Sequence, residues 1–214
     1  MLQLSDYRNK DFNKFLGYEG AVNIKLSEVT DIYLGQPIRD RIVNEPDGDH
    51  WIVQIKDVDK DSGIIRETLY RTHLKGRTGP RLIKKGDLLF VSRVFRGSLP
   101  YSVLVDADLP NLVAAPTFYI LSVNKDQVRA EYLHWFINSE VHGGRFFKQN
   151  AMGSSVLNIP KGVLSEMEVM LPPLQEQDRF IKLLQAANRE KEIMEILVEK
   201  RRAFIDAVLT KFSE

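Results

Sequence analysis

Three aspartates stand at alternate positions in a short acidic segment, and calcium-binding loops use this spacing. Asp57, Asp59 and Asp61 have it, and carboxylate oxygens are preferred ligands of Ca²⁺. A calcium loop also needs glycine at its sixth position and an acid at its twelfth. Counted from Asp57, these positions hold Ser62 and Thr68. We therefore interpret the segment as a hairpin turn between two strands, and treat calcium binding as a minor alternative.

No other motif in the sequence supports catalysis. Gly153-Ser154-Ser155 starts like the nucleophile elbow of serine hydrolases, but Leu157 stands where the closing glycine belongs. The four histidines lack the spacing of metal ligands, and the chain contains no cysteine for thiolate chemistry. No glycine-rich phosphate loop is present. An enzyme is therefore the least favoured class, and we expect neither a metal nor a cofactor in this chain.

Positive charge is concentrated in two segments of the middle of the chain. RTHLKGRTGPR (71–81) carries four basic residues and no acid, and SRVFRGSLPYS (92–102) adds two arginines. Arginine on loops can reach phosphates or the guanine edge, and Asn and Ser, which are the weaker candidates here, can donate and accept at base edges or phosphates. A solvated basic surface without a ligand is the alternative. The candidate DNA-binding residues are Lys75, Arg77, Arg81, Arg93, Arg96, Asn150, Ser154 and Ser155.

Composition places the chain among ordinary globular proteins. Of its 214 residues, 43% are hydrophobic and 28% are charged, and the net charge is +1, so charge alone does not indicate nucleic acid. The absence of cysteine fits a reducing compartment. The N-terminal segment has no signal-peptide pattern, and no apolar run is long enough to span a bilayer. We expect a cytoplasmic protein without a membrane partner.

The order of patterns along the chain predicts a mixed α+β domain. Segments 51–58, 63–71, 86–94 and 167–171 are rich in β-branched and aromatic residues and are predicted as strands. Helical spacing begins near Val128, Gly143-Gly144 interrupts it, and AMGSSVLNIPKG (151–162) is predicted as a loop. Strands that precede helices are typical of α+β folds.

The C-terminal segment follows a different pattern. Pro172-Pro173 ends the last strand, and about 38 helical residues would form a rod ~57 Å long. Apolar residues recur along one narrow stripe at alternating spacings of three and four, as in a coiled coil, interrupted by Lys191 and Arg201. A second helix is the favoured partner, although an amphipathic helix could also lie on its own domain. The predicted dimer interface is Phe180, Leu184, Ala187, Met194, Val198, Ile205, Val208 and Phe212.

These features together resemble a known family. The segments KLSEVTDIYLG, WIVQIKDVD, KKGDLLFVSRVFRG, AAPTFYILSV, EYLHWFINS, FFKQNAMGSSVLNIPKGVL and above all MEVMLPPLQEQDRFIKLL resemble specificity (S) subunits of type I DNA restriction–modification systems. The resemblance is to a half-length form, with a target recognition domain over 1–171 and a conserved spacer helix over 172–214. Residues 1–22 would be a leading arm. The implied domain fold is α+β with a twisted, mostly antiparallel sheet.

The resemblance also implies a function. Full-length S subunits carry two recognition domains joined by two long antiparallel helices, and each domain recognises half of a bipartite site on double-stranded DNA. They are not catalytic. Modification (M) subunits methylate adenine with S-adenosylmethionine, and a restriction (R) subunit uses ATP and Mg²⁺. A chain with one domain and one helix would need to form a homodimer, whose two-fold symmetry predicts a palindromic bipartite site.

Two other classes of protein remain open at this point. The chain could be a coiled-coil protein-interaction module with no role on DNA. It could also be a silent recognition cassette that acts only after recombination into a full-length partner. Methyltransferase and helicase-nuclease genes beside its own gene would favour the specificity subunit over both.

Overall fold

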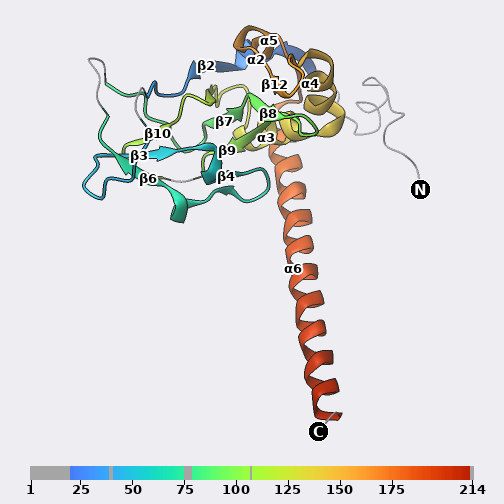
Figure 1. The fold of residues 1–214 in the computed structure, drawn as a ribbon. Coiled ribbons are helices and arrows are strands. Elements are labelled where there is room, and N and C mark those ends of the chain that lie inside the picture. The colour runs from blue at the N-terminus through green and yellow to red at the C-terminus, as the bar shows by residue number, and fades with distance from the viewer. Residues whose placement is uncertain (1–19, 39–40, 75–78, 107, 213–214) are drawn as a thin grey trace. The chain divides into compact units, whose positions relative to one another are not determined.

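The computed structural model describes residues 20–38, 41–74, 79–106 and 108–212 (Figure 1). The chain divides into two compact units, of which the first ends at Leu174 and the second begins at Gln175. The first unit contains all the strands that the structure describes, and the second is one long helix. The sequence placed the end of the recognition domain at Leu171.

A four-stranded antiparallel sheet lies at the centre of the first unit (Figure 1). Leu88–Val91 (β7) pairs on its two sides with Phe118–Val123 (β11) and Tyr101–Leu104 (β9), while Thr30–Leu34 (β2) pairs with the far side of β11. All four residues of β7 are buried. A continuous apolar run of this length, LLFV, is typical of a strand covered on both faces.

A three-stranded sheet completes the same hydrophobic core. Leu112–Ala114 (β10) runs parallel to His50–Val53 (β3), which pairs antiparallel with Tyr70–Thr72 (β6). Ile52 of β3 and Val113 of β10 are fully buried in one cluster with residues of β7, β9 and β11. The two sheets therefore share a core.

Three two-stranded sheets are added at the edges, which gives five sheets among the described residues. Most strand pairs are antiparallel, and this confirms the predicted α+β class, although the strands form several sheets and not one. The first residue of β1 is Val22, which the sequence assigned to the leading arm; residues 1–19 of that arm lie outside the described residues. The pairs are Val22–Lys25 (β1) with Glu168–Leu171 (β13), Val58–Asp59 (β4) with Gly63–Ile64 (β5), and Arg93–Phe95 (β8) with Val156–Asn158 (β12).

Short helices connect these strands. They are Leu26–Val29 (α2), Ala130–Asn138 (α3), the π-helix Glu140–Gly144 (η4), Arg145–Asn150 (α4), Lys161–Ser165 (α5) and the 3₁₀ turns Ile55–Asp57 (η2) and Arg66–Thr68 (η3). The predicted interruption at Gly143-Gly144 is a π-helical turn that continues into α4. A Cβ atom on Gly143 would lie 1.8 Å from the carbonyl oxygen of Ile137, so the chain can approach α3 only because this residue is glycine.

Four predictions of local structure were wrong: three strands were predicted as too long, and one strand was missed. The predicted strands at 51–58 and 63–71 each contain a 3₁₀ turn, and the strand at 86–94 is divided at Ser92 into β7 and β8. The predicted loop 151–162 contains strand β12. In the first case the Asp57 carboxylate accepts the backbone N–H of Gln54 at 2.9 Å, which ends β3. Such a side-chain bond competes with the strand ladder.

The calcium-like segment is a hairpin turn, as predicted. The Asp59 Oδ1 atom accepts the N–H groups of Asp61 and Ser62, at 3.0 and 2.8 Å, and the Ser62 hydroxyl at 2.9 Å. The bonds from Ser62, and then that from Asp61, hold the pKa of the Asp59 carboxyl below its usual value. β4 and β5 pair on either side of this turn. No group of three or more acidic or histidine side chains within the described ranges is arranged to hold a metal ion.

The second unit is the helix Leu174–Phe212 (α6), of 39 residues. This confirms the predicted long helix, and at ~1.5 Å per residue it is ~58 Å long. β13 ends at Leu171 and α6 begins at Leu174, so Pro172 and Pro173 separate the strand from the helix. Proline has no backbone N–H to donate to a strand ladder, which favours the end of the strand here. None of the helices in the described ranges combines the length and the apolar character that a membrane crossing requires.

A buried polar cluster fixes α3 to the central sheet. The Asn138 side chain accepts the backbone N–H of Ser102 at 2.8 Å and donates to its carbonyl oxygen at 2.9 Å. His134 lies beside this pair, with Nδ1 3.2 Å from the Ser102 hydroxyl. Burial, and secondarily Lys60, lowers the pKa of His134, so the imidazole is held in its neutral form.

We predict that acid destabilises the domain through this histidine. Because the pKa of His134 is lower in the folded state than in the unfolded state, the unfolded state binds more protons below the ordinary histidine pKa of about 6.5. Stability is complete above that pH and falls as the pH decreases through 6.5. Thermal unfolding midpoints at pH 7.5, 6.5 and 5.5 should therefore decrease, and His134→Gln should reduce the decrease. His142, whose pKa burial also lowers, should account for the remainder. An unchanged pH dependence in the variant would contradict this role.

Candidate nucleic-acid interface

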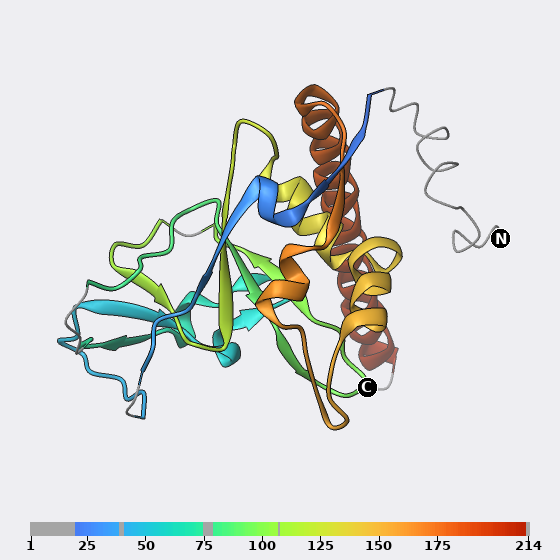
Figure 2. The same ribbon diagram turned by 90° about the horizontal axis from the view of Figure 1, so that it is seen from above.

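A two-stranded ribbon brings four of the candidate DNA-binding residues together. In the antiparallel pair β8–β12, Arg93 lies opposite Asn158 and Phe95 opposite Val156. Beyond the strands, the Arg96 N–H donates to the carbonyl oxygen of Ser155 at 3.1 Å. The pairing thus places Arg96 beside Ser155 and Arg93 beside Asn158. The two segments lie far apart in the sequence but side by side in the fold (Figure 2).

Two glycines shape the ends of this ribbon. Ser98 N–H donates to the Phe95 carbonyl at 3.1 Å across a turn in which Gly97 has φ +102°. In the facing loop Gly153 has φ +112°, and a Cβ atom there would lie 2.1 Å from the carbonyl oxygen of Val156. Side chains are disfavoured at such positive φ angles, so the loop requires glycine. The sequence motif Gly-Ser-Ser is therefore a structural turn.

The side chains on this ribbon suit an anionic ligand. Arg93, Arg96, Ser154 and Ser155 are all exposed. The guanidinium groups offer forked donors that match phosphate or guanine, and the serine hydroxyls both donate and accept. The sequence segments 92–99 and 150–160 contain no acidic residue that would repel phosphate. A two-stranded ribbon is also one of the elements that the DNA major groove admits.

Arg81 occupies a different environment. Its guanidinium lies over the ring of Tyr33 in β2, with Cζ 3.3 Å from the ring centroid, while the residue stays exposed. Stacking on an aromatic ring fixes the plane of the guanidinium and leaves its N–H edges available. Arg81 therefore remains a candidate on a second surface. The predicted residues Lys75 and Arg77 lie outside the described residues.

Asn150 has a structural role that the sequence did not indicate. Its Nδ2 group donates to the carbonyl oxygen of Phe146 at 2.9 Å, within α4, and the residue is half-buried. Only the remaining amide atoms can bond a ligand. Asn150 is therefore the weakest of the candidates near the ribbon.

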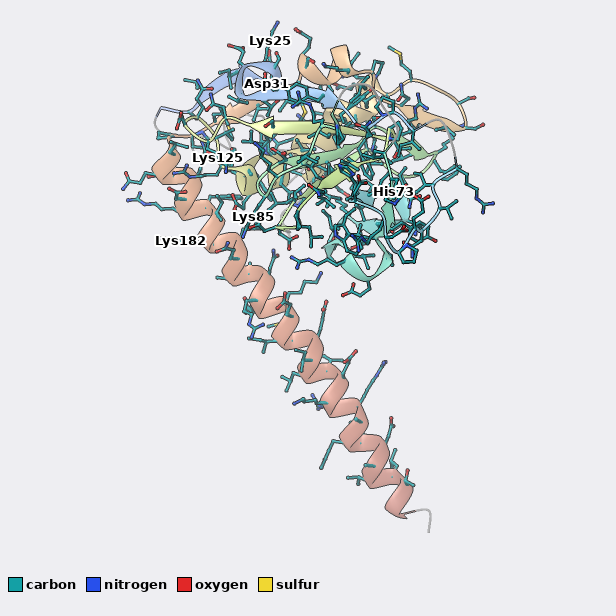
Figure 3. All side chains as sticks on the ribbon, turned by 90° about the vertical axis from the view of Figure 1, so that its left-hand side faces the viewer. Lys25, Asp31, His73, Lys85, Lys125 and Lys182 are labelled. Carbon is teal, nitrogen blue, oxygen red and sulfur yellow. The ribbon has the colours of Figure 1, made fainter. Side chains whose placement is uncertain are left out.

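Sequence reasoning overlooked a further group of cations. Lys85, Lys125 and Arg129 line a hollow of about 430 Å³ together with Glu131, and Figure 3 labels both lysines. Arg129 donates to the carbonyl oxygen of Lys125 at 3.1 Å, so part of its guanidinium bonds the backbone. Glu131 also balances part of the charge. These residues are separated in the sequence, and their proximity follows from the fold.

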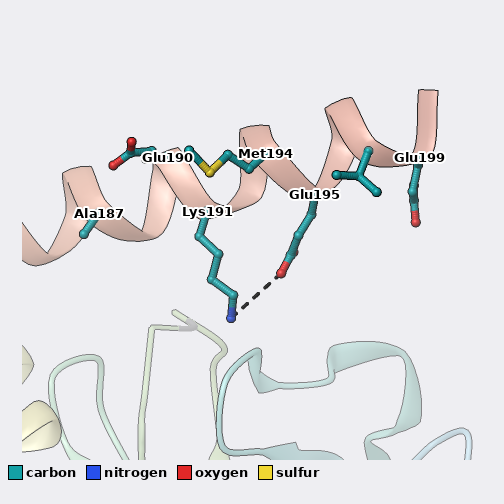
Figure 4. A pocket seen from close by; sticks show the side chains of 7 residues that line it. Ala187, Glu190, Lys191, Met194, Glu195 and Glu199 are labelled. Atoms are coloured by element: carbon teal, nitrogen blue, oxygen red, sulfur yellow. Dashed lines mark ion pairs between the residues drawn. The ribbon is translucent and has the colours of Figure 1, made fainter. Parts of the chain in front are cut away.

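Four of the eight predicted interface residues of α6 are exposed. Met194 is 56% exposed and Val198 is 59% exposed, and charged residues flank them (Figure 4). Lys191, which interrupts the apolar stripe, lies 3.9 Å from the carboxylate of Glu195. Ala187 and Ile205 are exposed, while Phe180, Leu184 and Val208 are partly buried. The side chain of Phe212 lies outside what the structure describes.

The apolar surface of α6 is broader than the predicted narrow stripe. Ile193, Leu197 and Phe204 are 53%, 65% and 69% exposed. Each directly precedes a residue of the predicted stripe. The three therefore form a second stripe about 100° around the helix from the first. The sequence analysis considered apolar residues at spacings of three and four along one stripe, and it did not predict the adjacent stripe. The helix therefore has surface for more than one helical partner.

A comparison with protein families identifies the family of this chain. The model of the type I restriction modification DNA specificity domain matches residues 19–199, which is most of the chain. The chain belongs to this family. The match includes the ribbon, the central sheets and more than half of α6. A comparison with curated protein sequences found no significant match.

Solved structures support the same fold. The S subunit of a type I restriction-modification system from M. genitalium has a TM-score of 0.54 and 16% identity over 94% of this chain. The HsdS subunit from Thermoanaerobacter tengcongensis has a TM-score of 0.59 and 20% identity over 84% of the chain. A structure concerned with complex assembly and conformational transition of the type I R-M system has a TM-score of 0.64 and 20% identity over 86% of the chain. This chain spans about half the length of these proteins, covering 45–46% of each.

We predict that Arg96 contributes to DNA affinity through its charge. Arg96→Ala should weaken binding to all DNA sequences and reduce the slope of log affinity against log salt by about one unit, because one phosphate contact is lost. Arg66→Ala, which removes an equally exposed arginine from η3, is the matched control and should leave both quantities unchanged. Fluorescence anisotropy at several salt concentrations, on the assembled complex, measures them. An identical slope in wild type and Arg96→Ala would remove Arg96 from the interface.

Proposed function

We propose that this chain is the non-catalytic DNA sequence-recognition subunit of a type I restriction–modification complex. The observation that carries the proposal is the family match over residues 19–199. The domain through Leu174 would recognise one half of a bipartite site on double-stranded DNA. The helix α6 would join it to a second recognition domain and set the distance between the half-sites.

The geometry of the domain supports this assignment. A rigid antiparallel ribbon presents exposed Arg93 and Arg96, and a stacked Arg81 lies on a second surface. Arginines held by backbone pairing or stacking bind with a smaller loss of conformational freedom than mobile ones. Such positions suit contacts that fix register on phosphates and distinguish base edges.

Catalysis would belong to the partner subunits. Modification subunits would supply adenine methylation with S-adenosylmethionine, and a restriction subunit would use ATP and Mg²⁺. This chain would hold none of these groups. Because the complex acts on the cell's DNA, we place it in the cytoplasm.

The exposed apolar stripe with Met194 and Val198 on α6 supports a homodimer of this chain. The matched region covers 45–46% of each related structure, and two copies would supply two domains and two helices. The stripe with Met194 and Val198 would pair the two copies, and the stripe with Leu197 and Phe204 would contact the modification subunits. Two apolar stripes on one helix suit two helical partners, because each seam needs its own contact surface.

The deciding experiment is to co-express the chain with the modification subunit encoded beside it and to map adenine methylation across the host genome. We expect a palindromic motif divided by a fixed gap, since a two-fold dimer imposes its symmetry on the site. An asymmetric divided motif would mean that another specificity chain supplies the second half. No new methylation from an assembled complex would favour a silent cassette or an interaction module without a DNA role.

Paired substitutions on α6 distinguish its two stripes. Val198→Asp should convert dimers to monomers in light scattering, because a charge buried without a partner weakens a helical seam by roughly 100-fold or more. Leu197→Asp should stay dimeric and lose affinity for the modification subunit. Gln185→Asp places the same charge outside both stripes and is the control. A Val198→Asp protein that remains dimeric would show that this stripe is not the dimer interface.

A further inference from the structure

The ribbon β8–β12 exposes three large apolar side chains, which the DNA-binding assignment above leaves unexplained. Phe95 is 80% exposed, Met152 is 58% exposed and Val156 is 46% exposed. Phenylalanine is among the residues most often buried in proteins. A cluster of this kind, surrounded by polar groups, is typical of a contact surface.

Backbone pairing fixes the direction of the aromatic ring. Phe95 lies directly opposite Val156, so the two side chains share one face of the ribbon. The preceding residue, Val94, packs against the hydrophobic core. Because side chains alternate along a strand, inward packing of Val94 directs Phe95 outward. Met152 forms an isolated antiparallel bridge with Asn158 of β12, through two backbone bonds of 2.9 and 2.8 Å.

The charged residues of the two ribbon segments are arginines. Arg93 precedes Phe95 by two residues and so shares its face, and Arg96 follows it. The two segments that build the ribbon, 92–99 and 150–160, contain no acid. Phenylalanine, methionine and arginine are also enriched at protein–protein interfaces. DNA is favoured here because the two segments hold arginines and no acid, which suits an apolar group flanked by phosphates.

We propose that Phe95, supported by Val156, contacts the 5-methyl group of a thymine in the DNA major groove. The major groove is about 12 Å wide and admits a two-stranded ribbon, whereas the minor groove is about 6 Å wide. Thymine alone among the four bases presents a methyl group there, and phenylalanine is one of the residues that contact it. Arg93 and Arg96 bind the phosphates on either side.

This inference rests on the proposed DNA-recognition function and adds a residue that determines specificity. Phe95 would distinguish thymine from the other bases at one position of the half-site. The methyl contact is apolar, so it is independent of the arginine contacts. It can therefore be removed from the DNA without changing any hydrogen bond.

The experiment uses the assembled complex and duplexes that carry the motif found by methylation mapping. Each thymine of the half-site is replaced in turn by uracil, which lacks only the methyl group. For the wild type we expect one replacement to weaken binding about fourfold, the value of one buried methyl group. Phe95→Ala should bind the thymine duplex more weakly and show no further loss with uracil at that position. Phe95→Leu should retain part of the discrimination.

Ile55→Ala is the matched control, because it shortens another exposed apolar side chain, 42% accessible and located in η2. It should preserve the wild-type uracil pattern. Thermal unfolding and gel filtration of each variant confirm that fold and assembly are unchanged.

The outcomes separate this inference from the proposed function. If the wild-type complex binds its motif and no uracil effect depends on Phe95, the methyl contact is wrong and DNA recognition stands. If Phe95→Ala and Phe95→Leu lose the modification subunit and keep the uracil pattern, the apolar group serves a protein contact and the inference is overturned. If the wild-type complex shows no sequence preference at all, the proposed function fails, and the inference fails with it.

Discussion

Burial of strand β7 is the constraint on which the recognition surface depends. Its four residues are shielded from water, and removing each large apolar side chain from water contributes roughly 1.5–3 kcal/mol. The strand pairs on both sides, so its position in the sheet is fixed. The chain then passes through Ser92, whose carbonyl accepts the N–H of Ile159 at 3.0 Å, into β8. That bond joins the end of β7 to the segment that supplies β12. The ribbon is therefore connected to the buried core through both of its strands.

How much the sequence could predict depended on whether a feature is local. The long helix, strand β13 and the Asp59 turn follow from periodicity and turn chemistry within a few residues, and they were predicted. The break at η2 depends on one carboxylate, that of Asp57, bonding a backbone N–H three residues earlier. Strand β12 has only three residues, directly follows Gly153-Ser154-Ser155, and pairs with β8. Propensity cannot show such pairing, since it joins segments about 60 residues apart.

The same distinction applies to the candidate site. Charge in the sequence selected Arg93 and Arg96, which are exposed in the structure, and the fold joins Arg96 to Ser155 by a backbone bond. Charge could not select Phe95, because an aromatic residue in a strand is predicted to be buried. Its exposure follows from the inward direction of Val94, which is a property of the register. On α6 the heptad pattern of the sequence predicted one apolar stripe, whereas the exposed apolar residues form two.

The ribbon separates the residues that fix its geometry from those that face a ligand. Gly153 sets the loop because a side chain would collide with the Val156 carbonyl, and Val94 anchors the strand in the core. The outward positions Arg93, Phe95 and Val156 take part in the β8–β12 ladder through their backbone atoms. Replacing an outward side chain therefore changes the surface while the ladder persists. A recognition domain built in this way can acquire a different DNA preference without a different fold, because geometry and specificity lie on opposite faces of the same two strands.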